Sequence, residues 1–363
     1  MENLKIILNT NLKQKPDTTH ELGFGKKFTD HMFTMVYKEG KGWYDAKIQP
    51  YTQIAFDPAT TVFHYAQGVF EGLKAYKNEN DEILLFRPEE NFKRLNASAR
   101  RMCIPQIDEK FALQALCKLL EIEKDWIPTA EGTSLYIRPS IIATNVELGV
   151  HTSVEYLFFI ILSPVGAYYK NGLAPIKLLV EDFYVRAAVG GTGEAKCIGN
   201  YGASLKAAEK AVQHGCDQVL WLDAKEHKYL EEVGSMNIFA VIDDVIVTPA
   251  LTGSILPGIT RKSCIELLKA SGYRVEERNI SIEELIYAQE TGKLTEIFGS
   301  GTAAVISPVG SIQYKDRVYA IGNGNMGRVT NYLYSVLTGI QYGKIEDRLN
   351  WTYNVTKNAE QEI

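Results

Sequence analysis

The stretch Gly190-Gly191-Thr192-Gly193-Glu194-Ala195-Lys196-Cys197-Ile198-Gly199-Asn200-Tyr201-Gly202 places one lysine among small, flexible residues, and a tyrosine follows five positions later. A lysine that attacks a carbonyl carbon needs close approach of the backbone, partial removal from water and a polar neighbour that orients the adduct. Lys196 has small neighbours, and Tyr201 supplies a hydroxyl. An ordinary glycine-rich turn explains the same residues equally well.

The composition of the whole chain excludes several classes of protein. The 363 residues are 45% hydrophobic and 23% charged, which suits a globular protein with two domains. A net charge of -5, with both signs mixed along the chain, argues against a nucleic-acid partner. The five cysteines are scattered, which disfavours disulfides and a zinc site. No apolar run approaches the ~20 residues of a membrane span, and no secretory signal opens the chain, so we expect a cytoplasmic protein that binds small molecules.

Residue spacing predicts alternating strands and helices. In the N-terminal half we expect strands at 61–65, 83–86, 134–138 and 156–162, and helices from Pro88 to Met102 and over 111–122. The Pro- and Gly-rich residues 163–175 predict a domain boundary near 168–176. Beyond it we expect strands at 176–180, 218–222, 237–242 and 245–248, the last two forming a hairpin, and helices at 203–214, 260–270 and 282–290. Gly215 and Gly272 fit helix ends, and Ser281 with Glu284 fits a capping box.

Three features could bind an anion. Gly258 precedes an expected helix, so the N–H groups of Ile259 and Thr260 and the Thr260 hydroxyl could hold a phosphate. A turn of small residues at 299–304 offers more donors, and Arg94 adds a charge. The alternatives are an ordinary helix cap, a tight connection and a solvated arginine.

A carboxylate also precedes an apolar strand, in Glu231-Glu232-Val233-Gly234-Ser235-Met236-Asn237. It could be buried against a cation, or it could be a loop acid. The sequence has none of the common nucleotide-binding, zinc-protease or serine-hydrolase motifs, and its six histidines show no ligand spacing. A metal or a nucleotide is therefore disfavoured.

Taken together, these motifs resemble the branched-chain amino acid aminotransferases of the class IV pyridoxal-phosphate enzymes. The resemblance covers about residues 20 to 345. It is carried by Lys196 with 199–202, by 232–237, 256–260 and 299–303, and in the N-terminal half by Phe24-Gly25, His64-Tyr65, Phe70-Glu71-Gly72, Arg87-Pro88, 136–139 and 166–168.

The resemblance implies an α/β (α+β) protein with the two-domain D-amino-acid-aminotransferase-like fold. It implies a smaller domain over 1–168, a linker over 169–176, a larger domain over 177–363 that carries Lys196, and pyridoxal 5′-phosphate at the domain interface. The implied reaction is reversible transfer of the amino group of L-leucine, L-isoleucine or L-valine to 2-oxoglutarate. A homodimer is also implied, in which the segment around His151 helps to close the partner's pocket.

The resemblance also implies site residues. Lys196 would hold the cofactor as an imine and move the proton, Glu232 would pair with the ring nitrogen, and Tyr201 would bond the phenolic oxygen. The remaining cofactor contacts would come from Arg94, Ser235, Leu256, Gly258, Ile259, Thr260 and Thr302. The substrate would be bound by Phe24, Tyr65, Phe70, Tyr136, Arg138, Tyr168, Thr302 and Ala303, although each aromatic ring could instead be ordinary packing.

The chain departs from the family pattern in two features. Some relatives have a redox-active C-x-x-C where this chain has Ala304 and Ser307, so thiol regulation is not expected there. Position 231 is a second acid, which strand alternation should turn away from Glu232. The alternative functions are a D-amino-acid aminotransferase, a pyruvate-releasing lyase of the same fold, and a non-catalytic pyridoxal-phosphate-binding protein.

Overall fold

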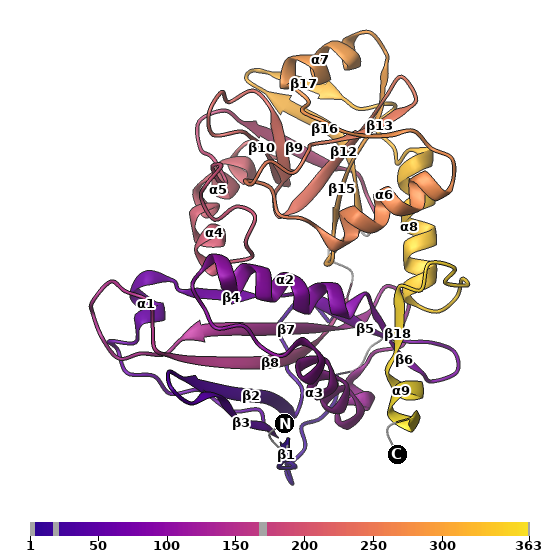
Figure 1. Cartoon of the computed structure of the whole chain (residues 1–363). Coiled ribbons are helices and arrows are strands. Elements are labelled where there is room, and N and C mark those ends of the chain that lie inside the picture. Colours follow the sequence, from indigo (N-terminus) through magenta and orange to yellow (C-terminus); the bar gives the residue numbers. More distant parts are fainter. Residues whose placement is uncertain (1–3, 17–21, 167–172, 362–363) are drawn as a thin grey trace. The chain divides into compact units, whose positions relative to one another are not determined.

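The computed structural model describes residues 4–16, 22–166 and 173–361 of the chain. The chain divides into two compact units (Figure 1). The first contains Met1–Tyr168, Ala195–Gly199 and Gly339–Ile363, and the second contains Tyr169–Glu194 and Asn200–Thr338. Lys196 is therefore grouped with the N-terminal residues, whereas the sequence analysis assigned it to the C-terminal domain. Residues 169–172 of the expected linker lie outside the described residues, and the domain bounds stay a prediction.

The first unit is built on a mixed sheet of nine strands among the described residues, in the order β1-β3-β2-β8-β7-β5-β6-β18 with β4 paired to β7. The strands are β1 (Lys5–Ile6), β2 (His31–Lys38), β3 (Gly42–Pro50), β4 (Gly68–Phe70), β5 (Leu73–Lys77), β6 (Ile83–Phe86), β7 (Ser134–Ala143), β8 (Glu155–Val165) and β18 (Thr352–Asn354). The helices are α1 (Thr61–Tyr65), α2 (Pro88–Arg101), α3 (Glu109–Ile122) and α9 (Val355–Gln361).

The core of this unit lies between the sheet and the apolar faces of α2 and α3. Phe92 and Leu95 of α2 and Leu116 of α3 are fully buried with Phe33 and Phe158 of the strands. The Asp108 side chain accepts a hydrogen bond from Phe111 N and so caps α3. The packing fixes α2, which is the helix that carries Arg94.

The second unit is built on a second nine-stranded sheet within the described residues, in the order β11-β10-β9-β16-β15-β12-β13-β14 with β17 paired to β16. An additional pairing of β11 with β12 closes six of these strands into a ring. The strands are β9 (Ile176–Glu181), β10 (Gln218–Leu222), β11 (Leu230–Val233), β12 (Met236–Ile242), β13 (Val245–Thr248), β14 (Val275–Glu277), β15 (Leu294–Gly301), β16 (Val305–Tyr314) and β17 (Arg317–Ala320).

Helices α5 (Leu205–Gln213), α6 (Ile259–Ala270) and α7 (Ile282–Glu290) pack on this sheet. Helices α4 (Ile198–Ala203) and α8 (Arg328–Gln341) each contain a boundary between the two units. Within the part of the chain that the structure describes, no helix has the length and apolar character needed to cross a membrane.

Most of the predicted elements are confirmed, including α2, α3, α6, α7 and the hairpin of β12 and β13. Asp243 and Asp244 have φ values of 48° and 62° in that hairpin turn, as a tight two-residue connection requires. Gly215 and Gly272, with φ values of 68° and 82°, end their helices as predicted. Ser281 Oγ accepts from Glu284 N at 3.0 Å, which confirms the Ser281 half of the predicted capping box, while the Glu284 carboxylate accepts from Arg278.

One predicted element is wrong. Residues 61–65 form helix α1 rather than a strand. Their β-branched and aromatic residues favour a strand, but Thr61 N donates to Asn145 O and the chain turns at Ala66 with a φ of 52°, so tertiary contacts override the local preference. The helix expected over 203–214 is confirmed as α5, which begins two residues later, and the Ser204 hydroxyl donates to Tyr201 O at 2.8 Å where α4 ends and α5 begins.

Candidate active site

Lys196 is held in the first unit by its backbone. Lys196 N donates to Ser98 Oγ of α2 at 2.9 Å, and Phe70 N of β4 donates to Lys196 O at 3.0 Å. The Lys196 Nζ lies 4.9 Å from the centre of the Phe70 ring. The glycine-rich stretch is therefore more than a turn, since it fixes the lysine against a strand and a helix.

Predicted substrate residues gather around Phe70 on one face of the first sheet. The Arg138 guanidinium lies 4.6 Å from the Phe70 ring, and its Nη2 donates to the Tyr136 hydroxyl at 3.1 Å. The Phe24 ring lies 4.9 Å from the Tyr136 ring. A Cβ on Gly72 would lie only 2.1 Å from the Tyr136 hydroxyl oxygen, so glycine at this position is needed for the approach. The structure thus brings together Lys196 and four of the predicted substrate residues.

Two other predicted substrate residues are not in this group. Tyr65 is on α1 and donates from its hydroxyl to Leu148 O, and it is 37% exposed. Tyr168 lies outside the described residues.

Arg94 is buried and bonded to a carboxylate that the sequence analysis did not select. Its Nε donates to Glu71 Oε1 at 2.7 Å and its Nη2 to Glu71 Oε2 at 2.9 Å. Asn91 Nδ2 donates to Glu71 Oε2 at 2.8 Å. Burial disfavours the Glu71 carboxylate, but Arg94, Lys196 and Asn91 outweigh it and hold its pKa below the ordinary value. Glu71 belongs to the motif Phe70-Glu71-Gly72. The residues around it do not indicate that its partner is Arg94, which lies 23 residues later in the chain.

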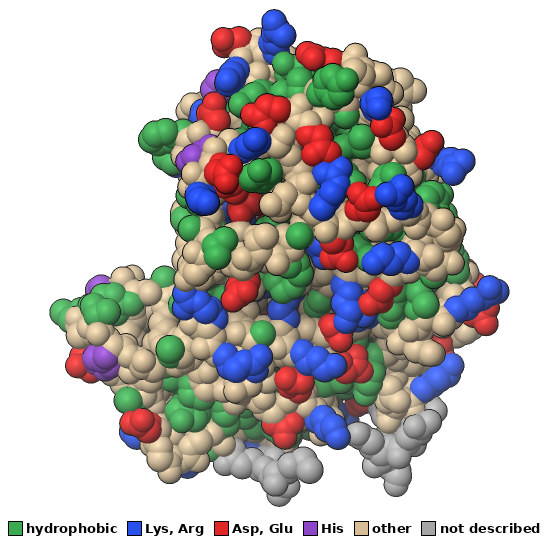
Figure 2. Space-filling view, turned by 45° about the horizontal axis from the view of Figure 1, so that its top comes forward, with side chains coloured by type: hydrophobic (Ala, Val, Ile, Leu, Met, Phe, Trp, Pro, Cys, Tyr) green, Lys and Arg blue, Asp and Glu red, His purple; other side chains and the backbone are tan. Residues whose placement is uncertain are grey.

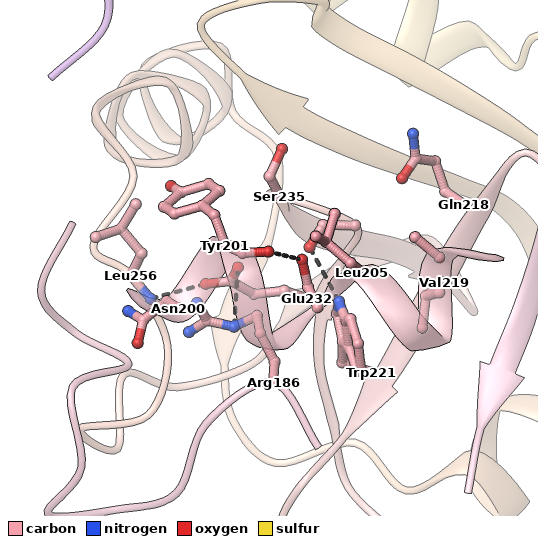
Figure 3. A pocket seen from close by; sticks show the side chains of 13 residues that line it. Arg186, Asn200, Tyr201, Leu205, Gln218, Val219, Trp221, Glu232, Ser235 and Leu256 are labelled. Carbon is pink, nitrogen blue, oxygen red and sulfur yellow. Dashed lines mark hydrogen bonds and ion pairs between the residues drawn. The ribbon is translucent and has the colours of Figure 1, made fainter. Parts of the chain in front are cut away.

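In the second unit, Glu232 of β11 lines a cavity of about 240 Å³. Figure 3 shows its carboxylate joined to two groups, because Leu256 N donates to Oε1 at 2.7 Å and Arg186 Nε lies 3.3 Å from Oε2. Glu232 is only 2% exposed. Tyr201, Ser235 and Leu256 line the same cavity, so four predicted cofactor residues meet there.

The two adjacent acids face opposite ways, as strand alternation predicts. Glu231 lines a different cavity, of about 410 Å³, and accepts a hydrogen bond from the Ser254 hydroxyl. Burial raises the pKa of Glu231. Only Glu232 is therefore positioned to serve the cavity that contains Tyr201.

The predicted phosphate cradle is built from α6 and the loop before it. Gly258 occupies the N-cap of α6 and makes no side-chain cap, an arrangement that suits a helix N-terminus that binds a phosphate. A Cβ on Gly258 would lie 2.0 Å from Asn237 Oδ1, while Asn237 Nδ2 donates to Leu256 O at 2.9 Å. Glycine is thus required where the loop crosses β12.

Thr302 and Ala303 lie in the turn between β15 and β16. Asn237 pairs with Ser300 across β12 and β15, so the strand next to the cradle leads directly into this turn. Among the residues that the structure describes, Gly258, Ile259, Thr260, Thr302 and Ala303 are not part of the 240 Å³ cavity lining. Across residues 4–16, 22–166 and 173–361, no group of three or more His, Cys, Asp or Glu side chains could hold a metal ion.

Comparison with known proteins gives concordant results. The family model described as "Amino-transferase class IV" matches residues 68–312. Branched-chain-amino-acid aminotransferase 2 of Bacillus subtilis (strain 168) is 55% identical over 359 residues, which cover 99% of each chain. A probable branched-chain-amino-acid aminotransferase of Staphylococcus aureus (strain N315) is 57% identical over 98% of this chain and 99% of its own.

A solved structure agrees with the sequence relatives. The Escherichia coli branched-chain amino acid aminotransferase has a TM-score of 0.73 at 30% identity, covering 88% of this chain and 99% of its own. A second solved branched-chain amino acid aminotransferase, from T.th. and complexed with N-(5′-phosphopyridoxyl)-L-glutamate, has a TM-score of 0.69 at 26% identity, covering 88% and 98%.

Proposed function

We propose that this chain, which belongs to the class IV aminotransferase family, transfers the amino group of L-leucine, L-isoleucine or L-valine reversibly to 2-oxoglutarate. The observation that carries the proposal is that relatives named for this activity are 55% and 57% identical over nearly the whole chain. The Lys196 group and the Glu232 cavity supply residue types that the reaction needs.

The residues of each unit fit pyridoxal 5′-phosphate. The first unit offers the Lys196 amine and the buried Arg94, and the second offers the buried Glu232 carboxylate and the N–H groups at the start of α6. The Gly258 position, which a Cβ would fill, suits close approach of a phosphate. When bound, the cofactor would accept the electron pair that remains as the substrate Cα loses its proton.

In this proposal the chain's own residues divide the work. The Lys196 amine would take the proton from the substrate Cα as general base and would then deliver it to the cofactor's C4′ as general acid. Glu232 keeps a proton on the ring nitrogen, and Tyr201 and Ser235 bind polar groups of the ring. Arg94, Gly258, Ile259, Thr260 and Thr302 hold the phosphate.

The same proposal assigns the substrate to the aromatic group of the first unit. Phe24, Phe70 and Tyr136 offer an apolar surface, and burial of an aliphatic side chain contributes about 1.5 to 3 kcal/mol. Arg138 supplies a cation beside Tyr136. Tyr65, Thr302 and Ala303 would bind the substrate carboxylate, and Tyr168 would complete the pocket.

The first prediction concerns the substrate. Purified protein with pyridoxal 5′-phosphate, L-leucine and 2-oxoglutarate should form L-glutamate, and its absorbance spectrum should change on addition of L-leucine alone. D-Alanine with 2-oxoglutarate is the control, because a D-amino-acid aminotransferase would use it. Glutamate formed from D-alanine but not from L-leucine would contradict the proposal.

We further propose a homodimer that uses an apolar surface beside α1. Four side chains of this surface are largely exposed: Phe63 (61%), Val146 (59%), Leu148 (63%) and Val150 (82%). Glu147 N donates to Ala59 O and Tyr65 to Leu148 O, so α1 and residues 146–150 are joined. Figure 2 shows hydrophobic and histidine side chains together at the left edge, where α1 lies in Figure 1. Such a surface suits a second copy, with His151 adjacent.

Sedimentation velocity tests the dimer. We expect a dimer for the wild type and a shift toward monomer for Val150→Glu, because the substitution places a charge in the apolar contact. Val318→Glu, at a 66% exposed position in the second unit, is the control and should remain dimeric. A monomeric wild type would contradict the proposal.

The cytoplasmic location also stays a prediction.

A further inference from the structure

Arg186 is a buried cation beside the carboxylate that lines the 240 Å³ cavity. Arg186 belongs to none of the sequence motifs named above. Its side chain is 9% exposed, and its Nε lies 3.3 Å from Glu232 Oε2, whose side chain is 3% exposed (Figure 3). Because a buried arginine cannot lose its proton, this pair places a permanent positive charge next to Glu232.

The backbone fixes the direction of this arginine. Arg186 Nη2 donates to Gly193 O at 3.1 Å and also to Ser254 O. A Cβ on residue 193 would lie 2.1 Å from Ser254 O and 2.5 Å from Ala187 Cβ, so only glycine allows the two carbonyl groups to converge. Glycine is therefore needed at position 193 so that both carbonyl groups can accept from Arg186.

The charge of Arg186 acts on the protonation of the Glu232 carboxylate. An opposite charge within about 4 to 6 Å favours the ionised carboxylate. The hydrogen bond from Leu256 N to Glu232 Oε1, at 2.7 Å, favours the same state. The Arg186 guanidinium contacts the Glu232 carboxylate directly, whereas a basic ring nitrogen would meet it only through that carboxylate. Protonation of the carboxylate is then opposed more strongly than protonation of the nitrogen.

We propose that Arg186 is a positioning residue that keeps Glu232 ionised and oriented, and thereby keeps the proton on the ring nitrogen of bound pyridoxal phosphate. This inference rests on the proposed function. The step involves one proton only. With Arg186 present the proton is bonded to the ring nitrogen, and when Arg186 is substituted it moves to the Glu232 carboxylate.

The test is nitrogen-15 NMR of protein reconstituted with ring-¹⁵N-labelled cofactor. We expect a pyridinium signal for the wild type and a shift toward the pyridine position for Arg186→Met. Arg186→Lys restores a positive charge and should return the signal toward the wild-type position. Arg278→Met removes an arginine that is 37% exposed and paired with Glu284, and it should leave the signal unchanged.

Each outcome distinguishes the inference from the proposed function. A pyridine signal in the wild type would contradict the role of Glu232 itself. A pyridinium signal in both the wild type and Arg186→Met would overturn the role of Arg186 alone. If Arg186→Met does not fold, Arg186→Gln keeps a hydrogen-bond donor for Ser254 O without the charge, and a pyridinium signal in that variant would overturn the inference equally.

Discussion

Lys196→Ala is expected to lower the rate of glutamate formation from L-leucine by about 10³-fold, which is within the usual contribution of a general acid and base. The reason is local. The amine is presented beside Phe70 by two backbone hydrogen bonds, with Nζ 4.9 Å from the ring, and alanine leaves no group that can move the Cα proton. A coupled glutamate assay measures the rate.

The matched control for this variant is Lys206→Ala. Lys206 is a lysine of α5 with 65% side-chain exposure and an ion pair with Glu209, so its removal should leave the rate within about twofold, as for a surface change of about 0.5 kcal/mol or less. A Lys196→Ala protein with the wild-type rate would remove the lysine from the mechanism.

Glu71→Gln is expected to destabilise the cofactor-free protein by about 3 to 5 kcal/mol, the usual cost of breaking a buried ion pair from one side. Glu71 is fully buried, and Arg94, at 9% exposure, would keep its charge without the carboxylate that now receives two of its N–H groups. Urea unfolding measures the loss. Glu89→Gln, at an exposed position on α2, should change the free energy of unfolding by about 0.5 kcal/mol or less.

The pH dependence of the free energy of unfolding is a second way to test the role of Glu71. The folded-state pKa of Glu71 is lowered, so the ionised carboxylate stabilises the fold above the unfolded-state pKa of about 4.3. This contribution is lost as the pH falls below that value toward the folded-state pKa. The stability of Glu71→Gln should therefore fall less steeply between the unfolded-state pKa and acid denaturation, and equal slopes in the two proteins would contradict the assignment.

Local signals in the sequence predict the elements well where apolar spacing and caps agree. Helix α3 has both an apolar face and the Asp108 cap, and its predicted and observed ranges differ only at the first turn. Helix α1 fails because its residues favour one conformation and their tertiary hydrogen bonds impose another. Strands β2 and β3 were missed, and in β2 the first five residues are buried in succession and therefore lack alternation.

The candidate site divides in the same way. Residues that belong to a motif, such as Lys196, Tyr136 and Glu232, can be selected from the sequence and a family resemblance. The ion pairs of the site cannot be selected in this way, because Arg94 meets Glu71 and Arg186 meets Glu232 only when the chain folds. A charge in the sequence does not state whether it is solvated or buried, and burial decides its effect.

The tandem acids of β11 bear on what a shift in the register of this strand would do. A shift of one residue exchanges the two faces of a strand and would normally remove a functional side chain from its cavity. Here a shift in one direction would bring Glu231 to the place of Glu232 and would still present a carboxylate to the Tyr201 side, whereas the opposite shift would bring Val233 there. A second acid before Glu232 therefore compensates for a slip of this strand in one of its two directions.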